Sequence, residues 1–82
     1  MNIEETSKIL AMIALVETRK FTDEQIAAWQ LLLKDIEFIY ANEAVIRYYR
    51  MNTEQVKPAH IYKLAKDVKT EMSKKHYGNP NL

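Results

Sequence analysis

The clearest hydrophobic pattern in the chain lies in residues 22–40, where apolar side chains recur at spacings of three and four. Four of them would share one face of a single helix: Ile26, Trp29, Leu33 and Ile36. Thr22 is followed three residues later by Gln25, which is the spacing of a capping box. The pattern therefore predicts a helix over about residues 23–38 whose buried side centres on Trp29.

Two further segments on either side carry helical patterns. Residues 4–18 are predicted to form the first helix, and its middle, ILAMIALV, is apolar on every side. We expect such a helix to be central or to lend one side to a partner. Residues 42–51 are predicted to form a short third helix with Asn42 as its N-cap. Its inner stripe contains Ala44, Val45 and Tyr48.

A fourth helix is expected to begin at Pro58, because proline suits the first turn of a helix. Its buried stripe contains Ile61, Leu64, Ala65, Val68 and Met72. Gly78 and Pro80 near the end of the chain stop helices. We therefore predict an all-α fold, a compact bundle of four helices of which the third is short. Residues 1–75 form a single helical domain, and residues 76–82 form a short flexible tail.

The composition of the chain excludes several classes of protein and of site. The chain has no cysteine, which excludes a disulfide scaffold, a thiolate zinc site and a cysteine nucleophile. The longest apolar run covers residues 9–16, whereas a membrane span needs about 20 apolar residues. The acidic start, MNIEE, is unlike a secretory signal. We expect a soluble cytoplasmic protein without membrane contact.

The sequence lacks the constellations that catalysis requires. His60 and His76 lie far apart, no HExxH motif or glycine-rich phosphate loop is present, and the serines have no nearby base. We therefore predict no catalytic residues, no cofactor, no metal site and no enzyme activity. For His60 we favour a surface position or a bond to a helix end over a metal or proton-transfer role.

Charge is distributed unevenly along the chain. Residues 1–46 hold four basic and eight acidic side chains, for a net charge of −4, and residues 47–82 hold eight basic and three acidic, for +5. The C-terminal half either faces a negatively charged partner or presents a solvated lysine-rich helix face.

One interpretation of the basic half is DNA binding. The segment QVKPAHIYKLAKDV resembles the second half of a helix-turn-helix, although the glycine expected in the turn is missing. Four residues would face base edges: Lys57, His60, Tyr62 and Lys63. Three would approach phosphates: Arg47, Arg50 and Lys66. The tyrosines could also stack on single-stranded nucleic acid, but we favour half-buried core positions for them.

Several positions together resemble a known family. Residues 29–49 place Trp29, Leu33 and Asp35 in a W-x-x-x-L-x-D core that leads into A-x-x-A-V and an aromatic pair. A variable loop, the motif P-A-H-I at residues 58–61 and a basic helix follow. This arrangement is similar to the replicative-helicase loader/inhibitor family of phage and prophage replication modules in Gram-positive bacteria, over about residues 8–72.

The resemblance implies a non-enzymatic adaptor in the bacterial host cytoplasm that binds a hexameric replicative helicase and helps deliver it to a phage origin. In that family a flexible C-terminal extension contributes to helicase contact, but this chain offers only a short tail. The resemblance places four residues in the core: Trp29, Ala44, Val45 and Ile61. The partner or nucleic-acid surface that we predict contains Arg47, Arg50, Lys57, His60, Tyr62, Lys63, Lys66 and Lys69.

Two alternatives remain open at this point. The first is a small helix-turn-helix DNA-binding regulator. The second is a homodimeric phage structural or antitoxin-like protein, for which the apolar first helix is the motive.

Overall fold

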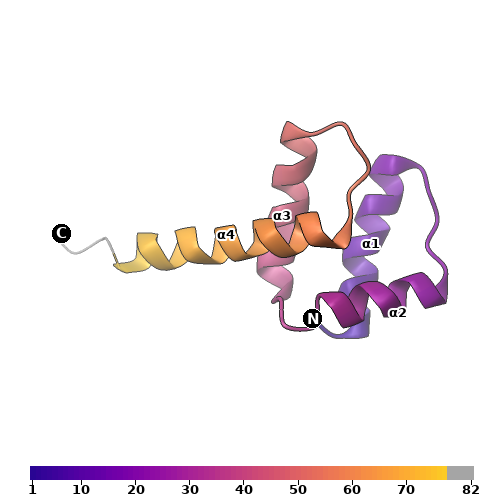
Figure 1. Cartoon of the computed structure of the whole chain (residues 1–82), viewed down its shortest axis with the longest axis horizontal. Helices are drawn as coiled ribbons and strands as arrows, with labels where there is room; N and C mark the ends of the chain where they lie inside the picture. The colour runs from indigo at the N-terminus through magenta and orange to yellow at the C-terminus, as the bar shows by residue number, and fades with distance from the viewer. Residues whose placement is uncertain (78–82) are drawn as a thin grey trace.

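The computed structural model describes the backbone of residues 1–77 and the side chains of residues 1–73. The described chain folds into four helices: α1 (Ile3–Glu17), α2 (Asp23–Leu32), α3 (Phe38–Met51) and α4 (Pro58–Tyr77). Helices α1 and α3 pack side by side, α2 crosses the foot of α1, and α4 crosses α3 and projects beyond it (Figure 1). The prediction of a compact all-α, four-helix fold is confirmed.

Helix α1 has one buried face and one exposed face. Asn2 and Glu5 form a reciprocal capping box at its start, and Thr18, with φ of 51°, ends it in the left-handed conformation. The core face contains Thr6, Ile9, Leu10 and Ile13. Leu15 is 83% exposed on the other side, so the apolar residues of this helix exceed what the bundle buries.

Helix α2 is shorter than predicted. The capping box between Thr22 and Gln25 is present, but the helix ends at Leu32 and a turn follows. The ammonium group of Met1 donates to backbone carbonyls of Leu33, Lys34 and Ile36 at 3.5, 3.0 and 2.7 Å. These bonds give partners to carbonyls of the turn that follows α2. The predicted continuous helix over residues 23–38 is therefore wrong, because long-range contacts stabilise a break.

The four residues of the predicted buried stripe still pack inward across this break. Trp29, Leu33 and Ile36 are buried, and Ile26 packs partly buried against them. Phe21 meets the Trp29 ring edge to face, with centroids 5.9 Å apart. The hydrophobic pattern thus identified the core residues correctly, although its last members lie in a turn.

Helix α3 begins four residues earlier than predicted. Glu37 is its N-cap, and Asn42 lies inside the helix, so the predicted cap is wrong. The helix has 14 residues and is longer than α2, which has 10. The predicted inner stripe of Ala44, Val45 and Tyr48 is buried.

Helix α4 packs on α3 along its first three turns. Ile61, Ala65 and Val68 are buried as predicted, whereas Leu64 is half-buried. Met72 is 44% exposed and its predicted burial is wrong, because the helix has by then passed the edge of α3 (Figure 1). Residues 78–82, most of the predicted tail, lie outside the described residues.

A buried polar cluster ties the connection between α3 and α4 to the end of α1. The Glu17 carboxylate accepts hydrogen bonds from the Tyr49 hydroxyl and from the Val56 backbone N–H, the latter at 2.9 Å. It also pairs with Arg19 at 2.8 Å, and its side chain is only 11% exposed. Arg19 in turn donates to the Val56 carbonyl at 3.3 Å and lies over the Phe21 ring.

This cluster, which we call the Glu17 cluster (Glu17, Arg19, Tyr49 and the Val56 backbone), fixes where α4 begins. Val56 is fully buried, and Pro58 starts α4 two residues later. Glu17 is the last residue of α1, and its local sequence does not reveal that its side chain is largely buried. Its hydrogen-bond partners Tyr49 and Val56 are 32 and 39 residues away in the chain.

Removing the central carboxylate should destabilise the fold. Glu17→Ala leaves the Tyr49 hydroxyl, the Val56 N–H and the Arg19 guanidinium without their acceptor. We expect a loss of about 2 kcal/mol in the free energy of unfolding, measured by urea denaturation. Glu54→Ala, at an exposed position in the neighbouring loop, should change it by less than about 0.5 kcal/mol. Equal effects of the two substitutions would contradict this role.

Stability should also fall at high pH. Burial, and then the hydrogen bond to Glu17, raise the pKa of Tyr49 above its ordinary value. Above about pH 10 the unfolded chain releases this proton while the folded chain keeps it, so the folded state binds more protons. The contribution of Tyr49 to stability should therefore be fully present below about pH 10, and the free energy of unfolding should decline above it. Urea denaturation between pH 8 and 11 should show a shallower decline in Tyr49→Phe, and an unchanged slope would contradict the assignment.

Candidate interaction surface

The predicted surface residues lie on the C-terminal half of α3, on the connection after it and on the first three turns of α4. Arg47 and Tyr62 are half-buried, and the other six are exposed: Arg50, Lys57, His60, Lys63, Lys66 and Lys69. They do not form one cluster, because those on α4 lie on two flanks of the helix, separated by its outer side. Each flank faces a different neighbour.

One flank faces the turn between α2 and α3. Tyr62, Lys66 and Lys69 follow at helical spacing on this side. The Lys66 amine lies 4.9 Å from the centre of the Tyr62 ring, and the Tyr62 hydroxyl donates to Asp35 at 3.2 Å. The Lys69 amine lies 3.8 Å from a Glu37 oxygen.

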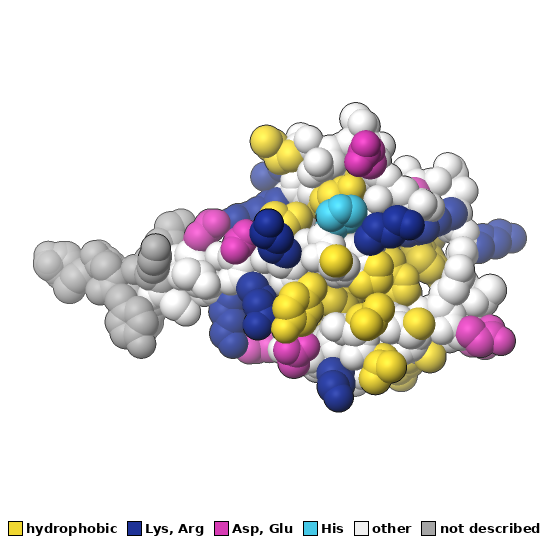
Figure 2. All heavy atoms as spheres, viewed as in Figure 1, with side chains coloured by type: hydrophobic (Ala, Val, Ile, Leu, Met, Phe, Trp, Pro, Cys, Tyr) yellow, Lys and Arg dark blue, Asp and Glu magenta, His cyan; other side chains and the backbone are white. Residues whose placement is uncertain are grey.

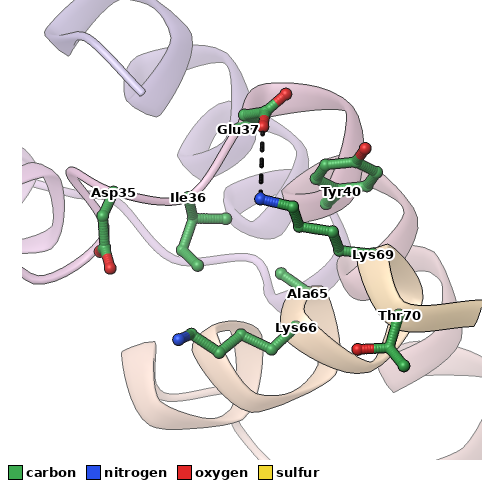
Figure 3. Close-up of a pocket in the computed structure, with 8 residues that line it drawn as sticks. All are labelled: Asp35, Ile36, Glu37, Tyr40, Ala65, Lys66, Lys69 and Thr70. Carbon is green, nitrogen blue, oxygen red and sulfur yellow. Dashed lines mark ion pairs between the residues drawn. The ribbon is translucent and has the colours of Figure 1, made fainter. Parts of the chain in front are cut away.

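Lys66 and Lys69, with Asp35 and Glu37, line a shallow cleft of about 340 Å³, in which Lys69 reaches toward Glu37 beside Tyr40 (Figure 3). Two carboxylates and two lysines line it: Asp35, Glu37, Lys66 and Lys69. Since both signs of charge are present, the cleft does not select an anion. The Glu37–Lys69 pair is well exposed, and such pairs contribute about 0–1 kcal/mol.

The opposite flank of α4 faces α3. The Arg47 guanidinium pairs with Glu71 at 2.9 Å and with Glu43 at 3.3 Å. The hydrogen bond to Glu71, and next the one to Glu43, raise the pKa of Arg47, while partial burial opposes them. This arginine therefore bridges α3 and α4, and its charge is already paired with two carboxylates.

His60 supports the first turn of α4. Its Nδ1 accepts a hydrogen bond from the Lys57 backbone N–H at 2.9 Å, and its ring lies against Tyr48 with centroids 4.9 Å apart. This geometry is that of a capping residue at a helix start. No group of three or more metal-ligating side chains gathers anywhere in residues 1–73.

Three predicted cations have no ion pair with any residue whose side chain is described: Arg50, Lys57 and Lys63. Lys66 contacts only the Tyr62 ring among the interactions of the described chain. These four charges are therefore available to a partner, in contrast to Arg47 and Lys69. None of the helices in the described part of the chain is long and apolar enough to cross a membrane.

Sequence analysis missed an apolar groove where the end of α2 meets the start of α4. This α2–α4 groove has a volume of about 480 Å³ and is lined by Leu32, Lys57, Pro58, Ala59 and Tyr62. Leu32 is 56% exposed, and the adjacent Leu31 is 64% exposed. Hydrophobic side chains gather over this face, with Lys and Arg side chains around them (Figure 2).

A local signal for this groove does exist in the sequence. Leu31, Leu32 and Leu33 are consecutive, and successive residues of a helix point about 100° apart. The buried stripe through Trp29 accounts for Leu33 only. The other two leucines must then face elsewhere, which marks an apolar surface but does not show that α4 borders it.

Comparison with protein-family models, curated proteins and solved structures finds no match to this chain.

Proposed function

We propose that this protein is a non-enzymatic adaptor that binds another protein through the α2–α4 groove and the lysines beside it. The observation that carries this proposal is an exposed apolar groove next to cations that have no carboxylate partner among the described side chains. Exposed apolar surface rimmed by polar groups is typical of interaction sites. Covering Leu32, Pro58 and Ala59 would remove apolar area from water, at about 25 cal/mol per Å².

The small size of the domain supports the same proposal. A chain of this length buries only about 60% of its unfolded surface, so its stability is marginal. Leaving two leucines of a ten-residue helix exposed forfeits burial that the fold could use. A partner that covers Leu32 would return part of that stabilisation to the complex.

The resemblance to the phage helicase loader/inhibitor family supports a replicative helicase as the partner. In this proposal the protein attaches to the helicase and takes no part in chemistry. The groove and the start of α4 supply the contact, with Lys57 in its lining and Lys66 beside Tyr62 as its charged border.

The test compares two neighbouring leucines. Leu32 lines the groove, whereas Leu31 is exposed on the same helix but does not line it. With purified replicative helicase of a Gram-positive host, Leu32→Ser should weaken binding about tenfold in calorimetry, and Leu31→Ser should leave it near wild type. Failure of the wild-type protein to bind the helicase would overturn the assigned partner, and equal effects of both variants would overturn the groove.

Direct DNA binding is the second candidate. It is favoured by the exposed cations Arg50, Lys57 and Lys63, which have no ion pair to another described side chain. The connection between α3 and α4 covers residues 52–57, however, and is longer than the turn of three to four residues in a helix-turn-helix.

Salt dependence separates the two candidates. If the protein is an adaptor, duplex DNA should bind only weakly, with a Kd above about 10⁻⁴ M at physiological salt, since few phosphates could be contacted. A DNA-binding protein would instead show a steep log–log dependence of affinity on salt. Fluorescence anisotropy from 50 to 200 mM salt measures this slope. A slope that falls by about two in Lys57→Glu/Lys63→Glu would favour DNA and contradict the adaptor.

A further inference from the structure

We infer that the α2–α4 groove receives an amphipathic helix of the partner protein, and that the edge of this helix facing α4 carries acidic side chains. This inference rests on the proposed adaptor function and specifies the partner's binding element. It follows from the lining of the groove and from the charges beside it.

The lining favours a helix over an extended segment. Leu32, Pro58 and Ala59 supply apolar contact from the last residue of α2 and the first two residues of α4, so no strand edge lines the groove. An extended peptide would bring backbone N–H and C=O groups that need partners, and this groove offers none in a row. A helix satisfies its own backbone and needs only an apolar surface, which is the helix-in-groove mode of recognition.

Small residues in the groove permit close approach. Pro58 and Ala59 line the groove together with the larger Leu32 and Tyr62, so a side-chain ridge of a partner helix can approach closely at the two small residues. The half-buried Tyr62 is held by its hydrogen bond to Asp35 and by the Lys66 amine over its ring. The wall on the α4 side is therefore ordered before a partner arrives.

Charge determines which helix fits. Lys57 lines the groove at the start of α4, and Lys66 lies beside Tyr62 further along the helix. Lys57 immediately precedes α4, and Lys66, nine residues later, lies about 13 Å further on at a helical rise of 1.5 Å per residue. Within the described chain neither lysine has an ion pair. A partner helix with carboxylates about two turns apart on one edge would pair with both.

Selection from a helical peptide library tests the inference. The library fixes apolar residues at positions i, i+4 and i+7 and varies the flanking positions among Glu, Gln and Lys. On the immobilised full-length protein, Glu should be enriched along one edge. For a selected peptide, Lys57→Glu/Lys66→Glu should weaken binding about fivefold and Leu32→Ser about tenfold. Lys8→Glu, at an exposed position on α1 outside the groove, is the matched charge control and should have no effect.

Several outcomes would overturn the inference: no enrichment over an uncoated support, enrichment of Lys, or selected peptides whose binding is unchanged by Leu32→Ser. A dimer in sedimentation velocity that Leu32→Ser dissociates would identify a second copy as the occupant instead. The two proposals fail separately. Helicase binding that survives Leu32→Ser refutes the groove, whereas acidic peptides that bind the groove without any helicase binding refute only the assigned partner.

Discussion

The arrangement of this protein depends on one carboxylate, that of Glu17. It lies at the end of α1 and accepts hydrogen bonds from a tyrosine of α3 and from the backbone that precedes α4. Arg19 neutralises it and holds the carbonyl of the same Val56. A carboxylate this far from water is stable only with such compensation. Because all of these partners converge on it, three helices and one connection have fixed relative positions.

The interaction surface is a consequence of this fixed geometry. Lys57, Pro58 and Ala59 directly follow Val56, so the Glu17 cluster positions one wall of the α2–α4 groove. The Met1 ammonium group bonds carbonyls beyond the end of α2 and so holds the other wall at Leu32. Two polar anchors therefore leave apolar side chains of two helices next to one another without covering them.

The candidate surface shows how far sequence reasoning reaches. The charge pattern pointed to the cations of the basic half, and the structure leaves Arg50, Lys57 and Lys63 exposed. The same pattern did not distinguish these cations from Arg47, which is paired with Glu43 and Glu71, because Glu71 lies 24 residues away along the chain. The groove escaped notice for a similar reason. The exposed leucines of α2 were visible in the pattern, but their neighbours on α4 are brought there only by folding.

By itself the sequence determined that there are four helical segments, where two of them begin and which apolar side chains form most of the core. These properties follow from local capping geometry at Thr22 and Pro58 and from the 3.6-residue period, which involve neighbours within one or two turns. Only the tertiary structure decided that the pattern through Trp29 breaks after Leu32. No glycine or proline marks this break. A distant group stabilises it: the Met1 ammonium donates to carbonyls of the turn after α2, which lie 32 to 35 residues away in the chain. The burial of Glu17 and the α2–α4 groove were decided in the same way, since both depend on contacts between residues that are remote in the chain.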